Sequence, residues 1–228
     1  MDKTKWIIFS VIVLAVFGGL IWFNRSETPD FTGDASKIIY DGPIADHFAG
    51  TEDQKVVLIE YGDYQCPACA RMYPTIKELE ATYPDKLTFI FRNRPLTTIH
   101  PNALAAATAA EAAGLQGQYF AMFDLLYSSQ DSWVKANTAQ RTAFFENLAA
   151  QLGLDINKFN ADLKSADISA KIARDRSTAE LYGANSTPTF VLNGVKVSES
   201  DSTDPEALTK LISDAVNAAY PAEQQPQQ

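Results

Sequence analysis

The sequence predicts a mixed α/β domain that carries an inserted block of helices and follows a single membrane-spanning helix. Three observations support this fold class. An uncharged, largely apolar run extends from Trp6 to Phe23. Two short segments of β-forming residues, 56–61 and 87–91, flank one helical stretch. A long helical region then separates this unit from a β-hairpin pattern closer to the C-terminus.

The apolar run 6–23 has the length of a transmembrane helix. As a helix it would span about 27 Å, close to the roughly 30 Å of a hydrocarbon core. Trp6 and Trp22 stand near its ends, where interfacial aromatic residues are common. A cleaved signal peptide is the alternative, but no small-x-small cleavage site follows the run. We therefore expect an uncleaved anchor over residues 1–24 that binds the lipid bilayer through residues 6–23.

The charges around this run predict its orientation. Lys3 and Lys5 precede it, whereas Arg25 follows it. Because positive charge is enriched on the cytoplasmic side, we expect a cytoplasmic N-terminus and an extracytoplasmic domain. Residues 25–44 are polar with Pro and Gly, which predicts a tether and lead-in. Residues 221–228 are rich in Gln and Pro and predict a disordered tail.

Between tether and tail, residues 45–220 are predicted to form one domain. A single helix connects the β segments 56–61 and 87–91, so these strands are expected to be parallel. The helical insertion is placed at about residues 96–164. The formal net charge of −9 argues against phosphate-backbone binding, so we expect no nucleic-acid partner.

Local signals predict where several elements begin and end. Gly114 is expected to end the Ala-rich helix as its C′ residue. The Asn193-Gly194 pair is a strong signal for a two-residue hairpin turn. Asp204 and Pro205 are expected to be the N-cap and first residue of the last helix.

The chain has only two cysteines, Cys66 and Cys69, three positions apart. They could form a redox pair, half of a metal site, or two inert buried thiols. A zinc site needs about four ligands, and His47 and His100 are the other candidate soft or borderline donors. Neither histidine shows paired spacing with the cysteines, so we expect no metal. For a redox pair we also expect no cofactor, because the sulfurs themselves carry the chemistry.

The redox interpretation has a local mechanism. Pro67 suits the first position of a helix, which places Cys66 at the N-cap and Cys69 one turn further on. Free backbone N–H groups and the helix dipole would then favour a thiolate at Cys66. We therefore predict that Cys66 is the exposed nucleophile and Cys69 the sheltered resolving thiol.

Together these features resemble the thioredoxin superfamily, and specifically the DsbA-like thiol–disulfide oxidoreductases. The evidence is the strand–CxxC–helix order, the helical insertion, and the Ser-Thr-Pro-Thr-Phe segment 186–190 before a hairpin. Segments 94–96, 99–103 and 116–127 resemble the membrane-anchored members of Gram-positive type. The resemblance covers about residues 45–220 and implies a thioredoxin fold with an inserted helical subdomain.

The resemblance implies further site residues. Thr187-Pro188 matches the family's cis-proline, which lies beside the active-site disulfide. Glu60 stands where relatives often keep a buried acid that handles the Cys69 proton, although a solvent-facing residue near a strand end is the alternative. Pro74 matches a proline that kinks the active-site helix.

The two histidines are expected to be non-catalytic. His100 precedes Pro101 at a predicted helix start, which favours a structural role over a Cys–His nucleophile. His47 is expected to lie on the surface.

The residues between the cysteines, Pro67 and Ala68, bear on the direction of the reaction. Many strongly oxidising relatives have histidine where Ala68 stands. Because one pKa unit and about 30 mV in a two-electron couple are the same energy, its absence predicts a moderately oxidising couple.

The resemblance implies a dithiol oxidase of the bacterial cell membrane that introduces disulfides into exported proteins with free thiols. A quinone-linked membrane partner of the DsbB or vitamin K epoxide reductase kind would reoxidise it. We expect a monomer. Two alternatives stay open: a reductant of extracytoplasmic disulfides, for example in cytochrome maturation, and an anchored non-catalytic binding module.

Overall fold

The computed structural model describes residues 43–52 and 54–221. The predicted anchor 1–24 and the C-terminal tail from residue 222 lie outside the described residues. Among the helices that are described, none is both long and apolar enough to cross a membrane.

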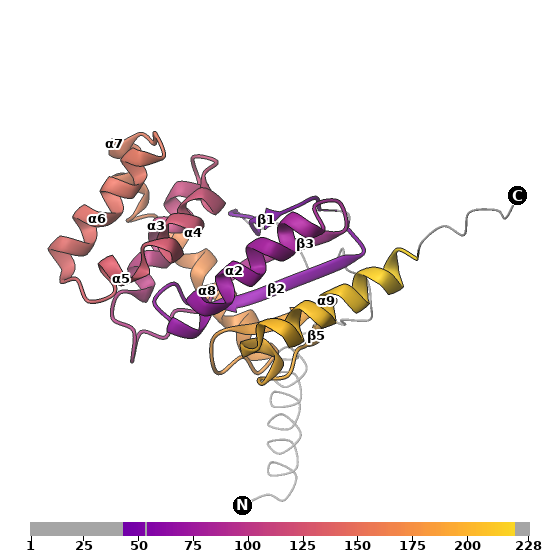
Figure 1. The fold of residues 1–228 in the computed structure, drawn as a ribbon. Coiled ribbons are helices and arrows are strands. Elements are labelled where there is room, and N and C mark those ends of the chain that lie inside the picture. The colour runs from indigo at the N-terminus through magenta and orange to yellow at the C-terminus, as the bar shows by residue number, and fades with distance from the viewer. Residues whose placement is uncertain (1–42, 53, 222–228) are drawn as a thin grey trace, which may run out of the picture. The chain divides into compact units, whose positions relative to one another are not determined.

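Five short strands form one sheet in the described residues (Figure 1). Its order is β1-β3-β2-β4-β5. The strands are β1 (Phe48–Ala49), β2 (Val56–Gly62), β3 (Leu87–Asn93), β4 (Thr189–Leu192) and β5 (Val195–Lys196). β2 and β3 are parallel, which confirms the prediction, and the other neighbours are antiparallel. β2 is therefore central and buried along its whole length.

The two faces of the sheet are covered by different helices. Side chains alternate along a strand, so Leu58 and Ile59 of β2 point to opposite sides. Leu58 joins the main core with α2 (Pro67–Thr82) and α9 (Pro205–Ala219). Ile59 joins a smaller cluster that α8 (Ala166–Leu181) covers. Every second residue of β2, Glu60 included, consequently faces α2.

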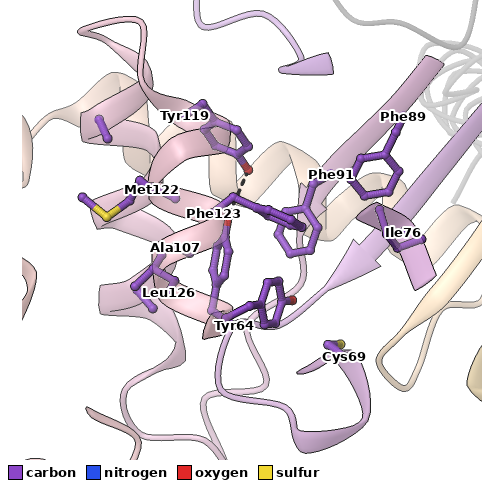
Figure 2. Packing of buried hydrophobic residues seen from close by; sticks show 14 of the residues in the cluster. Tyr64, Cys69, Ile76, Phe89, Phe91, Ala107, Tyr119, Met122, Phe123 and Leu126 are labelled. Carbon is purple, nitrogen blue, oxygen red and sulfur yellow. Dashed lines mark hydrogen bonds between the residues drawn. The ribbon is translucent and has the colours of Figure 1, made fainter. Parts of the chain in front are cut away.

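The predicted helical insertion is present between β3 and α8. It consists of α3 (Ala103–Gly114), α4 (Tyr119–Ser128), α5 (Gln130–Trp133), α6 (Thr138–Gln151) and α7 (Ile156–Asp162). Figure 1 shows these helices gathered beside one end of the sheet. Figure 2 shows Phe123 of α4 packed between Tyr64 and the rings of β3, and the Phe91–Phe123 ring centroids are 5.1 Å apart. This aromatic cluster joins the insertion to the sheet.

The predicted hairpin and last helix are confirmed. Asn193 and Gly194 both have positive φ, 47° and 81°, as a two-residue hairpin turn requires. A 3₁₀ turn, η2 (Asp201–Thr203), follows the hairpin. Asp204 caps α9 by accepting from two backbone N–H groups, and Pro205 is its first residue.

The prediction that Gly114 ends its helix as a C′ residue is wrong. Gly114 is the last residue of α3, and the left-handed conformation falls at Gly117, with φ of 77°. The glycine is needed for packing instead, because a Cβ there would lie 2.7 Å from Cε1 of His47. Glycine is found at position 114 because α3 approaches His47 closely, and glycine is also the residue type that commonly follows the end of a helix.

Candidate active site

The two cysteines begin the helix that follows the central strand. The loop 63–65 connects β2 to α2, whose N-cap is Cys66 and whose first residue is Pro67, as predicted. Both thiols are reduced and buried, with Cys66 6% and Cys69 1% exposed. The prediction that Cys66 is exposed is therefore wrong, because the cis-proline segment and the loop cover it, although it is still the more accessible of the two thiols. Ala68 between them is half-buried.

The Thr187-Pro188 segment lies directly against this helix start. Its peptide bond is cis, which confirms the prediction, and both residues are buried. Cys66 Sγ donates a hydrogen bond to the Thr187 carbonyl oxygen at 3.3 Å. Residues 121 positions apart thus meet at the reactive sulfur.

The surroundings of Cys66 favour its thiolate and lower its pKa to about 5. A hydrogen bond from the Cys69 thiol is the largest cause, and burial opposes it. The side chain of Thr187, as distinct from its carbonyl group, and the backbone N–H groups of Cys69 and Ala68 lower the pKa further. Those N–H groups belong to the first helical turn, where they have no partner within the helix. At neutral pH Cys66 is thus almost entirely a thiolate, the form that attacks disulfides.

The surroundings of Cys69 shift its pKa in the opposite direction. Burial, its hydrogen bond to Cys66 and the nearby charge of Glu60 raise its pKa well above the usual range. A backbone hydrogen bond from Asp63 lowers that pKa by a smaller amount. Cys69 therefore keeps its proton at neutral pH and needs a base to act as a resolving thiol.

Glu60 is the nearby acid that the sequence predicted. It is 2% exposed, points from β2 toward α2, and burial raises its pKa to about 8. A hydrogen bond with Cys69 opposes this rise, and the charge of Cys66 adds to it. The solvent-facing alternative is wrong, because both neighbours of β2 and helix α2 enclose this position. A carboxyl group of this pKa can both give and take a proton near pH 7.

Polar side chains that were not predicted as site residues from the sequence hold the loop before Cys66. Asp63 Oδ2 accepts from the N–H of Leu96 at 2.9 Å and lies 2.8 Å from His100 Nδ1. Gln65 Oε1 accepts from the N–H of Asn102 at 2.6 Å. These partners lie more than thirty positions away along the sequence, so local sequence patterns do not reveal the pairing. The only available signal is that polar residues occupy a short loop between a buried strand and a helix.

The helical insertion contacts the chain around Cys66 through Gln130, and Asn102 holds the neighbouring part of the insertion together. Gln130 Nε2 donates to the carbonyl oxygens of Tyr64 and Cys66, at 2.8 and 3.1 Å. Asn102 Nδ2 donates to the carbonyl oxygens of Trp133, Val134 and Ala136. The insertion therefore fixes the active-site loop by hydrogen bonds as well as by apolar packing.

Tyr127 of α4 is another buried neighbour of Cys69 and Glu60 that was not predicted as a site residue from the sequence. Its pKa is raised by burial and then by the charges of Cys69 and Glu60. Its hydroxyl is one of the buried polar atoms without a hydrogen-bond partner, as is Glu60 Oε1.

The prediction that His47 lies on the surface is wrong. Its side chain is 18% exposed, its ring stacks on Tyr119 with centroids 3.7 Å apart, and its Nε2 lies 2.8 Å from Glu111 Oε2. The missing side chain of Gly114 makes this burial possible. Within the described ranges, no group of three or more His, Cys, Asp or Glu side chains is placed to hold a metal ion.

Comparison with known proteins places this site in a family. Residues 43–214 match the family described as thioredoxin. The chain belongs to that family. Its matched part includes β2, both cysteines, the helical insertion and the cis-proline segment.

Two curated relatives are named as sodium/proton antiporters. One is Na(+)/H(+) antiporter NhaA 1 of Salinispora arenicola, 35% identical over 173 residues, which are 76% of this chain and 25% of the relative. Another is NhaA of Herminiimonas arsenicoxydans, 30% identical over 85% of this chain and 30% of the relative. The chain thus spans less than a third of either protein.

Solved structures share the fold. A thioredoxin-like oxidoreductase of Silicibacter pomeroyi has a TM-score of 0.62 and 25% identity, over 78% of this chain and 93% of that one. Wolbachia pipientis α-DsbA1 has a TM-score of 0.66 and 23% identity, over 82% of this chain and 98% of that one. Oxidised BdbD of Bacillus subtilis has a TM-score of 0.62 and 18% identity, over 75% of this chain and 92% of that one. The inserted helices are therefore part of an arrangement that these structures also have.

Proposed function

We propose that this protein is an extracytoplasmic dithiol oxidase that introduces disulfides into exported proteins through Cys66 and Cys69. The observation that carries the proposal is the opposite tuning of the two thiols, one with a pKa lowered to about 5 and one with a raised pKa. A thiolate of low pKa is a good leaving group, so a disulfide made from it is readily given to other thiols.

The exchange proceeds in two balanced steps. A substrate thiolate attacks Cys66 Sγ of the disulfide, the Cys66–Cys69 bond breaks, and Glu60 protonates the departing Cys69 sulfur. A second substrate thiolate then attacks the substrate sulfur of the mixed disulfide, and Cys66 leaves as a thiolate. The substrate loses two electrons and the cysteine pair gains them.

The cellular setting is part of the proposal. Oxidising compartments outside the cytoplasm are where disulfides persist, and the apolar run 6–23 would anchor the domain there. We propose a single-pass protein of the bacterial cell membrane, of the membrane-anchored Gram-positive type, that works as a monomer. A quinone-linked membrane partner of the DsbB or vitamin K epoxide reductase kind would return the cysteines to the disulfide.

One observation favours a reductant as the second candidate. Ala68 offers no imidazole to the Cys66 thiolate, which removes one source of oxidising power that relatives have. The hydrogen bonds from Cys69, Thr187 and the helix start still lower the pKa of Cys66 to about 5, and for that reason we place oxidation first.

The experiment measures disulfide formation in reduced, unfolded ribonuclease by the full-length oxidised chain in detergent. We expect one disulfide formed per chain, and complete loss of this activity in Cys66→Ser. Cys69→Ser cannot form the Cys66–Cys69 disulfide and should lose the activity too; mixed instead with a substrate that already contains a disulfide, its Cys66 thiolate should attack one substrate sulfur, release the other as a thiolate and stay trapped in the mixed disulfide. Activity that survives Cys66→Ser would contradict the proposal, and a wild-type chain that forms no disulfides in this assay would favour a non-catalytic binding module.

A further inference from the structure

Asp63, in the loop 63–65, contacts both cysteines through its backbone. Its carbonyl oxygen accepts from the Cys66 N–H at 2.9 Å, and its own backbone hydrogen-bonds the Cys69 sulfur. The position of Asp63 therefore sets how the sulfur of Cys69 and the N-cap of α2 are oriented.

The Asp63 side chain is in turn held by three N–H donors. Oδ1 accepts from the N–H of Gln65 at 2.8 Å, and Oδ2 accepts from the N–H of Leu96 at 2.9 Å. His100 Nδ1 lies 2.8 Å from the same Oδ2. Because a carboxylate can only accept, Nδ1 carries the proton of this contact. We call Asp63 with the donors Gln65, Leu96 and His100 the loop clamp.

His100 is the only member of the loop clamp that joins it by a side-chain donor. The Asp63 carboxyl is fully buried, while the imidazole is 16% exposed at the start of the insertion. Removing one donor from a buried carboxylate leaves it short of a hydrogen bond, which costs more than an exposed contact would. The segment before α3 is thereby coupled to the loop that carries the exchange site.

We infer that His100 is a positioning residue for disulfide exchange: by holding Asp63, it keeps the loop in the geometry that stabilises the Cys66 thiolate and therefore the dithiol form of the pair. This inference rests on the proposed function. His100 acts through Asp63 and is not assigned any contact with substrate.

The test compares three variants of the full-length chain in detergent. His100→Leu keeps the bulk but removes the donor, whereas His100→Asn places an amide N–H near the position of Nδ1. His47→Ala is the matched control, because it removes the chain's other histidine–carboxylate pair, which lies outside the loop clamp. If His100→Leu does not fold, His100→Gln replaces it, since its longer side chain cannot place the amide at Nδ1.

Two quantities are measured for each folded variant. One is the pH midpoint of Cys66 alkylation by iodoacetamide, and the other is the equilibrium constant of the cysteine pair with glutathione. For His100→Leu we expect a midpoint at least about half a pH unit higher and an equilibrium at least about threefold further toward the disulfide. His100→Asn should stay within about twofold of wild type, and His47→Ala should leave both quantities unchanged.

The outcomes separate this inference from the proposed function. If the wild-type chain exchanges disulfides but His100→Leu matches it in both quantities, the positioning role is wrong and the proposed function stands. Equal shifts in His100→Leu and His47→Ala would also overturn the positioning role, because the effect would then follow general destabilisation. A wild-type chain that forms no Cys66–Cys69 disulfide in glutathione buffers overturns the proposed function itself.

Discussion

At the scale of single residues, the exchange chemistry depends on two identical side chains that hold their protons very differently. Cys66 sits where free N–H groups and the Cys69 thiol stabilise a negative charge, so its pKa falls to about 5. Cys69 is one turn deeper, where burial and the carboxyl of Glu60 raise its pKa. The helix start creates this contrast, and in the proposed mechanism Glu60 is the group that transfers the proton of the buried thiol.

Glu60 makes folding stability depend on pH. Burial raises its pKa from 4.5 to about 8, so between these values the folded chain binds a proton that the unfolded chain has lost. The contribution of Glu60 to the free energy of unfolding must therefore fall as pH rises from about 4.5 to 8. We expect Glu60→Gln, in the reduced form, to be more stable than wild type by about 2 to 5 kcal/mol at pH 8.

Urea unfolding at pH 4.5 and at pH 8 checks this expectation. The stability difference between Glu60→Gln and wild type should be small at the lower pH and large at the higher one. Glu78→Gln, an exposed change on α2, serves as the control and should alter neither value. A difference of the same size at both pH values would show that Glu60 is not a buried, protonated acid.

At the scale of elements, the features that were predicted correctly are those that depend on residues close together in the sequence. The Cys66 N-cap, the Pro67 start of α2 and the Asn193-Gly194 turn each depend on neighbouring residues, and each is present. The contacts of Gln65 and Asn102 depend on a pairing across 37 positions, which residue spacing does not reveal. Gly114 shows the same limit, because its role depends on His47 from a distant segment.

Asn102 joins three elements of the insertion. Its amide donates to three carbonyl oxygens at the end of α5 and in the turn before α6, and its Oδ1 accepts from Arg141 at 2.8 Å. We expect Asn102→Ala to lower the free energy of unfolding by about 2 to 4 kcal/mol, because several buried polar groups lose their partner.

Urea unfolding again provides the measurement, with Asn137→Ala as the control. Asn137 is the N-cap of α6 and its contacts are local, so its loss should cost about 1 kcal/mol. If Asn102→Ala is no more destabilising than Asn137→Ala, the hydrogen bonds of Asn102 do not hold the insertion together.

At the scale of the whole molecule, the lead-in, the sheet and α8 share buried charges as well as apolar packing. Lys171 of α8 is fully buried and lies 2.7 Å from Asp175 and 3.3 Å from Asp46. Arg92 of β3 lies 2.6 Å from Asp46. The order of strands and helices was predictable from the sequence, but this network was not, because its members come from the lead-in, β3 and α8.

The central claim concerns the direction of electron flow through Cys66 and Cys69. Stabilising one thiolate favours the dithiol form, which makes the disulfide an oxidant. The lack of an imidazole at Ala68 limits this effect but leaves the contributions of Cys69, Thr187 and the helix start. A moderately oxidising couple is therefore expected of the intact protein.

The most direct measurement equilibrates the full-length chain in glutathione buffers and reads the oxidation of Cys66 and Cys69 by alkylation and mass spectrometry. We expect a single two-electron transition with a midpoint more positive than about −230 mV, in the range of proteins that donate disulfides. A midpoint at or below about −270 mV, near that of thioredoxin, would contradict the oxidase assignment and make the chain a reductant.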